Sequence, residues 1–183
     1  DDYKSSAFRA SVKKKPGEKY LLVDGYNIIF AWEDLRELAE ANIDAARGKL
    51  LDIMSNYQGI RKCQLIVVFD AYRVVGHDTE ILDYHNIHVV YTKEAETADQ
   101  YIEKFAHEHG RKYDVTVATS DGMEQIIIRG QGCSLLSARE LLEEVNLANQ
   151  TLREKYLEKQ QKDRSYLLDS MSEEELKKIR DLE

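Results

Sequence analysis

The sequence predicts an α/β fold with a central parallel sheet and helices on both of its faces. Short apolar runs of strand length alternate along the chain with segments whose apolar residues recur at helical spacing. The run at residues 65–69 is unbroken and rich in β-branched residues, a composition typical of a strand buried on both faces. Such alternation favours parallel strands that are joined by helices packed against the sheet.

The expected elements follow one another in a regular order. A strand at residues 20–23 ends at Asp24-Gly25, which is a turn sequence. Apolar residues at helical spacing then begin at Ile43 and stop near Gly59. Further along we expect strands at 65–69 and 87–91, a helix at 98–109, a strand at 115–118, a short helix at 123–129 and a strand at 133–136.

Two capping boxes indicate helices near the C-terminal end. In each, a serine is followed three residues later by a glutamate, so that each side chain can bond the other residue's backbone N–H. Ser137 with Glu140 opens a helix that is expected to reach about Gln161, where the apolar pattern lapses. Ser172 with Glu175 opens a short charged helix that we expect to be peripheral.

Length and charge distribution indicate one domain with an appendage at each end. The chain has 183 residues, of which 43% are hydrophobic and 33% charged, enough apolar material for a buried core. Bases exceed acids in the first residues, and acids exceed bases from Glu140 onward. We therefore expect a basic leader or linker at 1–18, a folded domain at 19–161 and a charged helical tail at 162–183.

Composition also narrows the class of function. Apolar runs are far shorter than a membrane span, and the first residues lack the pattern of a secretory signal. Cys63 and Cys133 are too few for a disulfide framework, so we expect a cytoplasmic protein with no membrane contact. A net charge of −8 argues against a general nucleic-acid binder but permits an enzyme that gathers acids in one site.

Acidic residues recur where the predicted strands end. Asp24, Asp70 and Asp121 each follow a strand, Asp99 lies in the first turn of a helix, and Glu96 precedes it by about one turn. Because the carboxyl ends of parallel strands meet at one edge of a sheet, these carboxylates are expected to converge there. Their mutual repulsion would be relieved by a hard divalent cation, Mg²⁺ or Mn²⁺, held by oxygen ligands.

Each of these acids has a structural alternative. Asp121 fits a helix N-cap, Asp24 a turn, and Asp99 a favourable position at the positive end of a helix dipole. Asp70 ends a strand where no turn needs it. The expected arrival of all of them at one edge favours a common site over these separate roles.

Polar and aromatic neighbours of these acids are candidates for contacts with a substrate. Asn27 could orient a water or a phosphate oxygen, with local turn capping as an equal alternative. Tyr26 could stack on a base, whereas Trp32 is expected in the core. The Thr119 and Ser120 hydroxyls could donate hydrogen bonds either to the acids or to phosphate, and the Arg47 and Arg73 guanidinium groups could bind phosphate. The sequence lacks the motifs of covalent hydrolases, P-loops and dinucleotide-binding folds.

Four blocks of this sequence, in order, resemble the YacP-type NYN domain family, a branch of the PIN-like nuclease fold. They read LVDGYN at 22–27, VVFDA at 67–71, YTKEAETAD at 91–99 and ATSD at 118–121, and the resemblance covers roughly residues 19–160. It implies a three-layer α/β fold and a Mg²⁺- or Mn²⁺-dependent endoribonuclease. It further implies cleavage of messenger RNA in association with the ribosome.

The same resemblance assigns roles to the matching residues. Asp24, Asp70, Asp99 and Asp121 would be metal ligands and Glu96 a fifth acid, while Asn27 would position water or phosphate. Hydrolysis would use a metal-activated water attacking the phosphorus in line, without a protein nucleophile. Both ends of the chain depart from the family pattern and resemble fusion to another module, such as part of a larger translation-associated chain.

Two other functions fit parts of the pattern. A non-catalytic RNA- or ribosome-binding module would keep the fold and bind RNA without turnover. A metal-dependent phosphatase is weakened because Asp70-Ala71-Tyr72 lacks the paired nucleophile of the Asp-x-Asp type. A phospho-receiver domain needs a lysine after a late strand, and Leu135-Leu136-Ser137 does not supply one.

Overall fold

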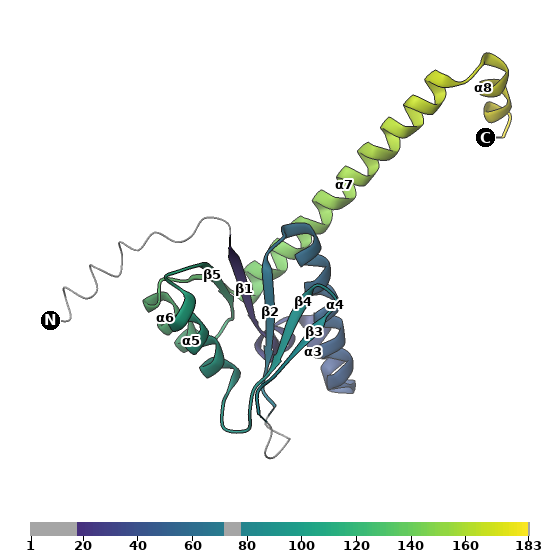
Figure 1. Cartoon of the computed structure of the whole chain (residues 1–183). Helices are drawn as coiled ribbons and strands as arrows, with labels where there is room; N and C mark the ends of the chain where they lie inside the picture. The colour runs from purple at the N-terminus through teal and green to yellow at the C-terminus, as the bar shows by residue number, and fades with distance from the viewer. Residues whose placement is uncertain (1–17, 72–77, 183) are drawn as a thin grey trace. The chain divides into compact units, whose positions relative to one another are not determined.

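The computed structural model describes residues 18–71 and 78–182 and contains one six-stranded sheet (Figure 1). The strand order is β3-β4-β2-β1-β5-β6, and every neighbouring pair is parallel except β3 with β4. The strands are β1 (Lys19–Asp24), β2 (Gln64–Phe69), β3 (Glu80–Tyr84), β4 (Ile87–Tyr91), β5 (Asp114–Ala118) and β6 (Ser134–Leu136). The predicted parallel core is therefore present, with an antiparallel edge strand added to it.

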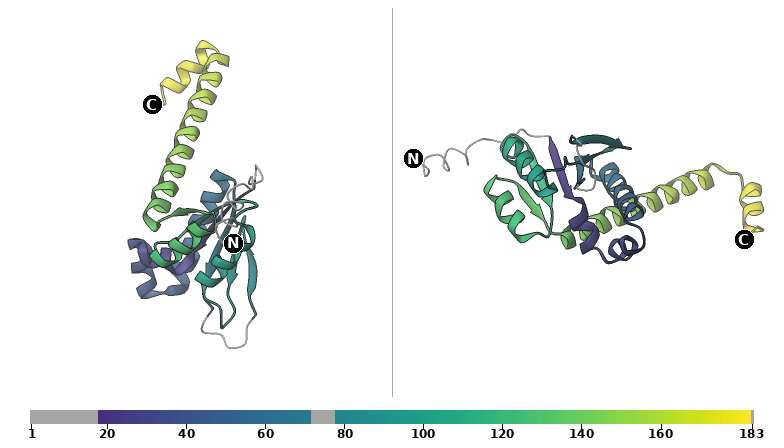
Figure 2. Two further views of the ribbon diagram at one scale, coloured as in Figure 1. Left: turned by 90° about the vertical axis from the view of Figure 1, so that its left-hand side faces the viewer. Right: turned by 90° about the horizontal axis from the view of Figure 1, so that it is seen from below.

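Helices cover both faces of this sheet, which confirms the expected three-layer arrangement (Figures 1 and 2). The connection from β1 to β2 and that from β4 to β5 run in opposite directions across the sheet, so right-handed crossovers place their helices on opposite faces. The first connection holds α2 (Gly25–Ala31), α3 (Glu33–Ala41) and α4 (Ile43–Arg61). The other face carries α5 (Ala98–His109) and α6 (Gly122–Gly130).

The strand register brings the ends of the parallel strands to one edge. Asp24 pairs with Val68 of β2, and Val23 pairs with Ala118 of β5. Gly25 permits this edge to be compact, because a Cβ at that position would overlap the Phe69 ring. Helix α2 can therefore begin directly beside β2, with Asp24 at the junction.

Four segments were missing from the sequence prediction or ended elsewhere. Helices α2 and α3 precede the expected helix at Ile43. Strand β3 was missed because it lies at an edge, where all but its last residue are exposed and no apolar alternation is needed. The helix opened by Ser137, α7, runs from Ala138 to Ser170, past the expected end near Gln161. Its distal part is largely exposed, so helix-forming polar residues sustain it without an apolar stripe.

Packing divides the chain into two compact units, one ending at Val145 and one beginning at Asn146. The division falls inside continuous helix α7, and the domain limits expected at residues 18 and 161 stay predictions. In the second unit, α8 (Glu173–Arg180) begins with the predicted capping box, because Ser172 Oγ accepts from the Glu175 N–H at 3.4 Å and Glu175 Oε2 from the Ser172 N–H at 3.1 Å. Among the described residues, we find no helix with the length and apolarity to cross a membrane.

Candidate metal centre

Three carboxylates converge at the edge where the parallel strands end. Asp24 closes β1, Asp99 lies in the first turn of α5, and Glu124 lies in the first turn of α6. One ligand oxygen of each lies within 4.8 Å of those of the other two. Asp24 and Glu124 are buried, at 6% and 4% exposure, whereas Asp99 is the more accessible of the three. This acidic cluster is the group that we call the metal centre.

Local structure leaves the Asp24 carboxylate available to this centre. Asp24 occupies the N-cap position of α2, but its side chain makes no hydrogen bond to that helix. Instead, its Oδ2 lies 3.2 Å from the Thr119 hydroxyl, which is also 3.0 Å from Glu124 Oε2. A single hydroxyl proton can serve only one of the two acids at a time.

Burial raises the pKa values of two acids in the centre, Asp24 and Glu124. Burial, and then the Asp24 charge, raises the pKa of Glu124 to about 10. The pKa of Asp24 rises to about 6, chiefly through burial and also through the charge of Asp99. Within the described residues, Glu124 Oε1 is the buried side-chain oxygen without a hydrogen-bond partner. Without a cation, the centre therefore retains a proton on Glu124 at neutral pH.

These features fit a hard divalent cation. Carboxylate oxygens are the ligands that Mg²⁺ and Mn²⁺ prefer, and an unsatisfied buried oxygen is costly unless something binds it. Asp24, Asp99 and Glu124 would hold such an ion through one oxygen each. The edge can thus hold a divalent cation among its acids.

Three of the predicted ligands lie outside this group of oxygens. The Asp70 carboxylate accepts from the N–H of Ala98, the first residue of α5, and so caps that helix from a different strand. Burial and then the Asp99 charge raise the pKa of Asp70, so it still interacts with the centre. Glu96 lies just before α5 and is half-buried. Ligand roles for Asp70, Glu96 and Asp121 stay predictions.

Asp121 has a defined structural task in α6. Its Oδ1 accepts from the N–H groups of Met123 at 3.0 Å and Glu124 at 3.2 Å, which makes it the N-cap of that helix. The capping alternative seen in the sequence is therefore present. By starting α6 at Gly122, this cap places Glu124 in the first turn, facing Asp24.

Replacing Asp121 separates its two possible roles. Asp121→Ala removes the cap and is expected to lower the unfolding free energy by about 1 kcal/mol. Asp121→Asn keeps a capping oxygen and is expected to leave metal-free stability within a few tenths of a kcal/mol of the wild type. Chemical denaturation without metal measures both. If Asp121→Asn also abolishes a metal-induced rise in melting temperature, Asp121 is a ligand in addition to a cap.

The polar residues predicted to contact substrate, Asn27, Thr119 and Ser120, form hydrogen bonds within the protein. Asn27 Oδ1 accepts from the Ser120 N–H at 2.7 Å, which is a long-range contact instead of a local turn. The Ser120 hydroxyl oxygen accepts from the Ala138 N–H at 2.8 Å. Thr119 is fully buried, with its hydroxyl toward the acids. Their roles toward substrate stay predictions.

The basic and aromatic candidates in the described residues also have partners within the protein. Arg47 Nη1 donates to the Tyr26 hydroxyl at 3.0 Å, and Arg47 Nη2 forms an ion pair with Asp44. The Tyr26 ring packs against Phe69, with centroids 5.0 Å apart. Trp32 is buried and structural, as expected. Arg73 lies outside the described residues.

Glu124 is a member of the centre that the sequence pattern did not indicate. A glutamate in the first turn of a helix looks like a favourable partner of the helix dipole, so nothing marked it as buried. A usable signal was present, since the predicted helix follows Asp121 directly and its first turn must lie at the same edge. Only the packing of α6 shows that the side chain is 4% exposed and turned toward Asp24.

Comparison with known proteins agrees with this architecture. The family model of the YacP-like NYN domain matches residues 21–183 and so includes the C-terminal helices that were expected to depart from the family. "Uncharacterized protein YacP" of Bacillus subtilis (strain 168) is 46% identical over 126 residues, 68% of this chain and 74% of that protein.

Two solved structures of a YacP protein are also similar to this chain. The crystal structure of Rae1 (YacP) from Bacillus subtilis aligns with a TM-score of 0.65 and 40% identity, covering 88% of this chain and 92% of that one. A point mutant of Rae1 gives a TM-score of 0.68 and 39% identity over 78% and 84% of the two chains. On the evidence of sequence, fold and acidic edge together, the chain belongs to the YacP-like NYN domain family, a branch of the PIN-like nucleases.

Proposed function

We propose that this protein is a metal-dependent endoribonuclease that hydrolyses RNA phosphodiesters, with messenger RNA on the ribosome as its substrate. The observation that carries the proposal is the buried Glu124 oxygen without a partner, held beside Asp24 and Asp99 where the parallel strands end. Membership of a PIN-like nuclease family supports the same chemistry. The cation would be Mg²⁺ or Mn²⁺.

The residues of the centre divide the work between binding and orientation. Asp24, Asp99 and Glu124 would hold the cation, and the Thr119 hydroxyl, which lies within hydrogen-bond distance of both Asp24 and Glu124, would orient one of them at a time. When bound, a divalent cation supplies Lewis-acid activation of water and of the phosphodiester. Asp99 is the most accessible of the three acids, so it lies on the side from which a substrate approaches.

An exposed aromatic pair in α2 supports RNA over a small phosphate ester. Phe30 is 52% exposed and stacks on Tyr26, with ring centroids 6.4 Å apart and planes 26° apart. Both residues belong to the helix that directly follows Asp24. Bases of single-stranded RNA stack on such rings regardless of sequence.

The acidic character of the chain supports delivery of the RNA by a partner. Phosphate contacts dominate RNA affinity, and a protein of net charge −8 attracts free RNA weakly. A cytoplasmic ribosome would present messenger RNA at high local concentration without requiring such attraction. Cleavage is therefore expected to be faster on translating ribosomes than on naked RNA.

A non-catalytic RNA- or ribosome-binding module is the second candidate. It is favoured by the commitment of the Asp70 and Asp121 carboxylates to backbone N–H groups, which leaves fewer acids for a cation. Such a module would retain RNA or ribosomes at every metal concentration and would never turn over substrate.

Metal removal and restoration test the proposal. Translating ribosomes are first cross-linked to their messenger RNA, so that the complex stays intact when Mg²⁺ is chelated. They are then incubated with protein treated with EDTA, and the products are mapped by primer extension. No cleavage is expected until Mg²⁺ or Mn²⁺ exceeds the chelator, because the centre then gains the cation that neutralises its acids. Protein boiled before metal addition is the control. Ribosome binding without cleavage at any metal concentration would favour the second candidate instead.

A further inference from the structure

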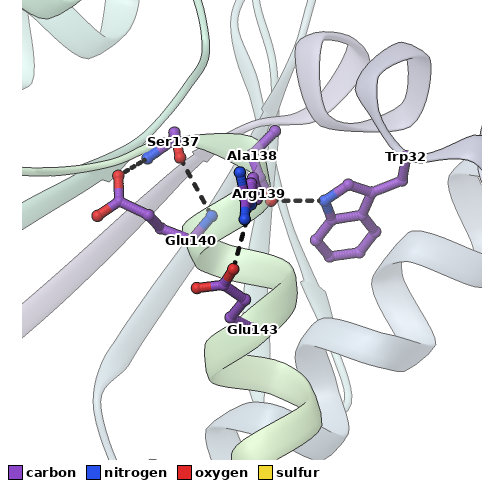
Figure 3. A network of polar contacts seen from close by, with 6 residues as sticks. All are labelled: Trp32, Ser137, Ala138, Arg139, Glu140 and Glu143. Atoms are coloured by element: carbon purple, nitrogen blue, oxygen red, sulfur yellow. Dashed lines mark hydrogen bonds and ion pairs between the residues drawn. The ribbon is translucent and has the colours of Figure 1, made fainter.

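Ser120 connects the metal centre to the first turn of α7. Its N–H donates to Asn27 Oδ1 in α2 at 2.7 Å, and its hydroxyl oxygen accepts from the N–H of Ala138 at 2.8 Å. The Ala138 carbonyl in turn accepts from Trp32 Nε1 at 2.7 Å (Figure 3). Since Trp32 immediately follows α2, these bonds and that helix close a ring, which we call the Ser120 brace.

One of the three hydrogen bonds of the brace is shielded from water. Trp32 and Ala138 are buried, so water does not compete for the bond between them. The start of α7 is held separately by its capping box, in which Ser137 Oγ accepts from the Glu140 N–H at 3.1 Å and Glu140 Oε1 from the Ser137 N–H at 3.0 Å (Figure 3). The Ala138 N–H lies in the first turn of α7, where backbone N–H groups have no acceptor within the helix. The Ser120 hydroxyl oxygen is the acceptor for this N–H.

Both chain neighbours of Ser120 act on the metal centre. Thr119 bonds Asp24 and Glu124, and Asp121 caps the helix that carries Glu124. A displacement of Ser120 would therefore move the support of two ligands at once. Metal sites tolerate little displacement of their ligands, and partners behind the ligands tune affinity.

We propose that Ser120 is a positioning residue for the cation, which acts by clamping the 119–121 loop between α2 and the first turn of α7. This inference rests on the proposed metal-dependent function and gives Ser120 a role through Asn27 and Ala138, whereas the sequence suggested bonds to the acids or to phosphate. By reciprocity, cation binding and the state of the brace are coupled, so that each stabilises the other.

Isothermal titration with Mn²⁺ tests the proposal without relying on activity. Ser120→Ala removes the acceptor for the Ala138 N–H and is expected to raise the dissociation constant about tenfold. Ser120→Thr restores a hydroxyl at an exposed position and is expected to bind within about twofold of the wild type. Ser137→Ala is the matched control, since it weakens the start of the same helix through the capping box and leaves the brace intact.

Ser137→Ala is expected to lower the melting temperature while keeping the wild-type dissociation constant. An equal loss of Mn²⁺ affinity in Ser137→Ala and Ser120→Ala would overturn the proposal, because it would assign the effect to general loosening of α7. Unchanged affinity in Ser120→Ala would overturn it as well, with the proposed function left standing. If the wild type binds no Mn²⁺, the metal centre itself is wrong and both proposals fail.

Fluorescence gives a second readout, because Trp32 is the single tryptophan of the chain. Saturation with Mg²⁺, which is not paramagnetic, is expected to shift the Trp32 emission in the wild type and in Ser120→Thr. In Ser120→Ala at saturating Mg²⁺, the shift is expected to fall by at least half. A full shift in that variant would show that the brace does not couple Trp32 to the centre.

Discussion

Asp24→Asn is expected to abolish RNA cleavage, with a loss of at least about 100-fold, while the protein stays folded. The substitution keeps the size of the side chain and removes the charge that a cation needs. Asp24 is buried, and burial is the main reason that its pKa is raised to about 6. Without metal, the neutral amide is therefore expected to leave stability unchanged or to raise it. Single-turnover cleavage and metal-free thermal melts measure the two effects.

Asp34→Asn is a suitable control for this change. Asp34 lies exposed in the first turn of α3, so its replacement removes one negative charge without touching the centre. Cleavage by this control is expected to match the wild type. Full activity in Asp24→Asn would contradict the proposed nuclease mechanism, and a large loss of its metal-free stability would show that Asp24 is structural.

Glu124→Gln is expected to remove the part of the pH dependence of metal-free stability that Glu124 contributes. The ordinary pKa of a glutamate is 4.5, and in the folded protein burial and the Asp24 charge raise that of Glu124 to about 10. The folded state therefore holds a proton that the unfolded state releases above pH 4.5. This contribution to stability is complete below that pH and is lost progressively as the pH rises toward about 10.

The comparison is made by urea unfolding in EDTA at several pH values between about 5 and 9. The difference in unfolding free energy between Glu124→Gln and the wild type is expected to grow with pH in favour of the variant, because glutamine cannot ionise. Glu143→Gln is the control, since this exposed glutamate pairs with Arg139 on the helix surface and such pairs contribute little. Parallel curves for Glu124→Gln and the wild type would refute the buried proton.

Added Mn²⁺ is expected to make the wild type more stable than Glu124→Gln, the reverse of their order without metal. Mn²⁺ raises the melting temperature of the wild type by binding the folded state, and Glu124→Gln loses this rise because one of three ligand carboxylates is gone. The rise in the wild type is expected to increase with pH, since the cation must displace the proton from Glu124. An undiminished rise in Glu124→Gln would place the cation elsewhere.

Much of the fold could be predicted because its signals are local. The apolar run at 65–69 is buried in the middle of the sheet, and the helix at 98–109 has the expected bounds. Edge strand β3 left no such signal, because its pairing with β4 uses backbone groups and leaves its side chains mostly in water. The extension of α7 to Ser170 also could not be predicted, since an exposed helix needs no apolar stripe.

The sequence by itself determined that acids lie near the carboxyl ends of the strands, because Asp24 directly follows an apolar run and Asp99 starts the helix after another. It could not determine which acids face one another. Tertiary packing turns Asp70 toward the N–H of Ala98 and Asp121 toward the first turn of α6, and it buries Glu124 beside Asp24. The physical reason is that a carboxylate near a helix start can either cap the helix or face a neighbouring acid. Contacts between residues far apart in the chain decide between the two.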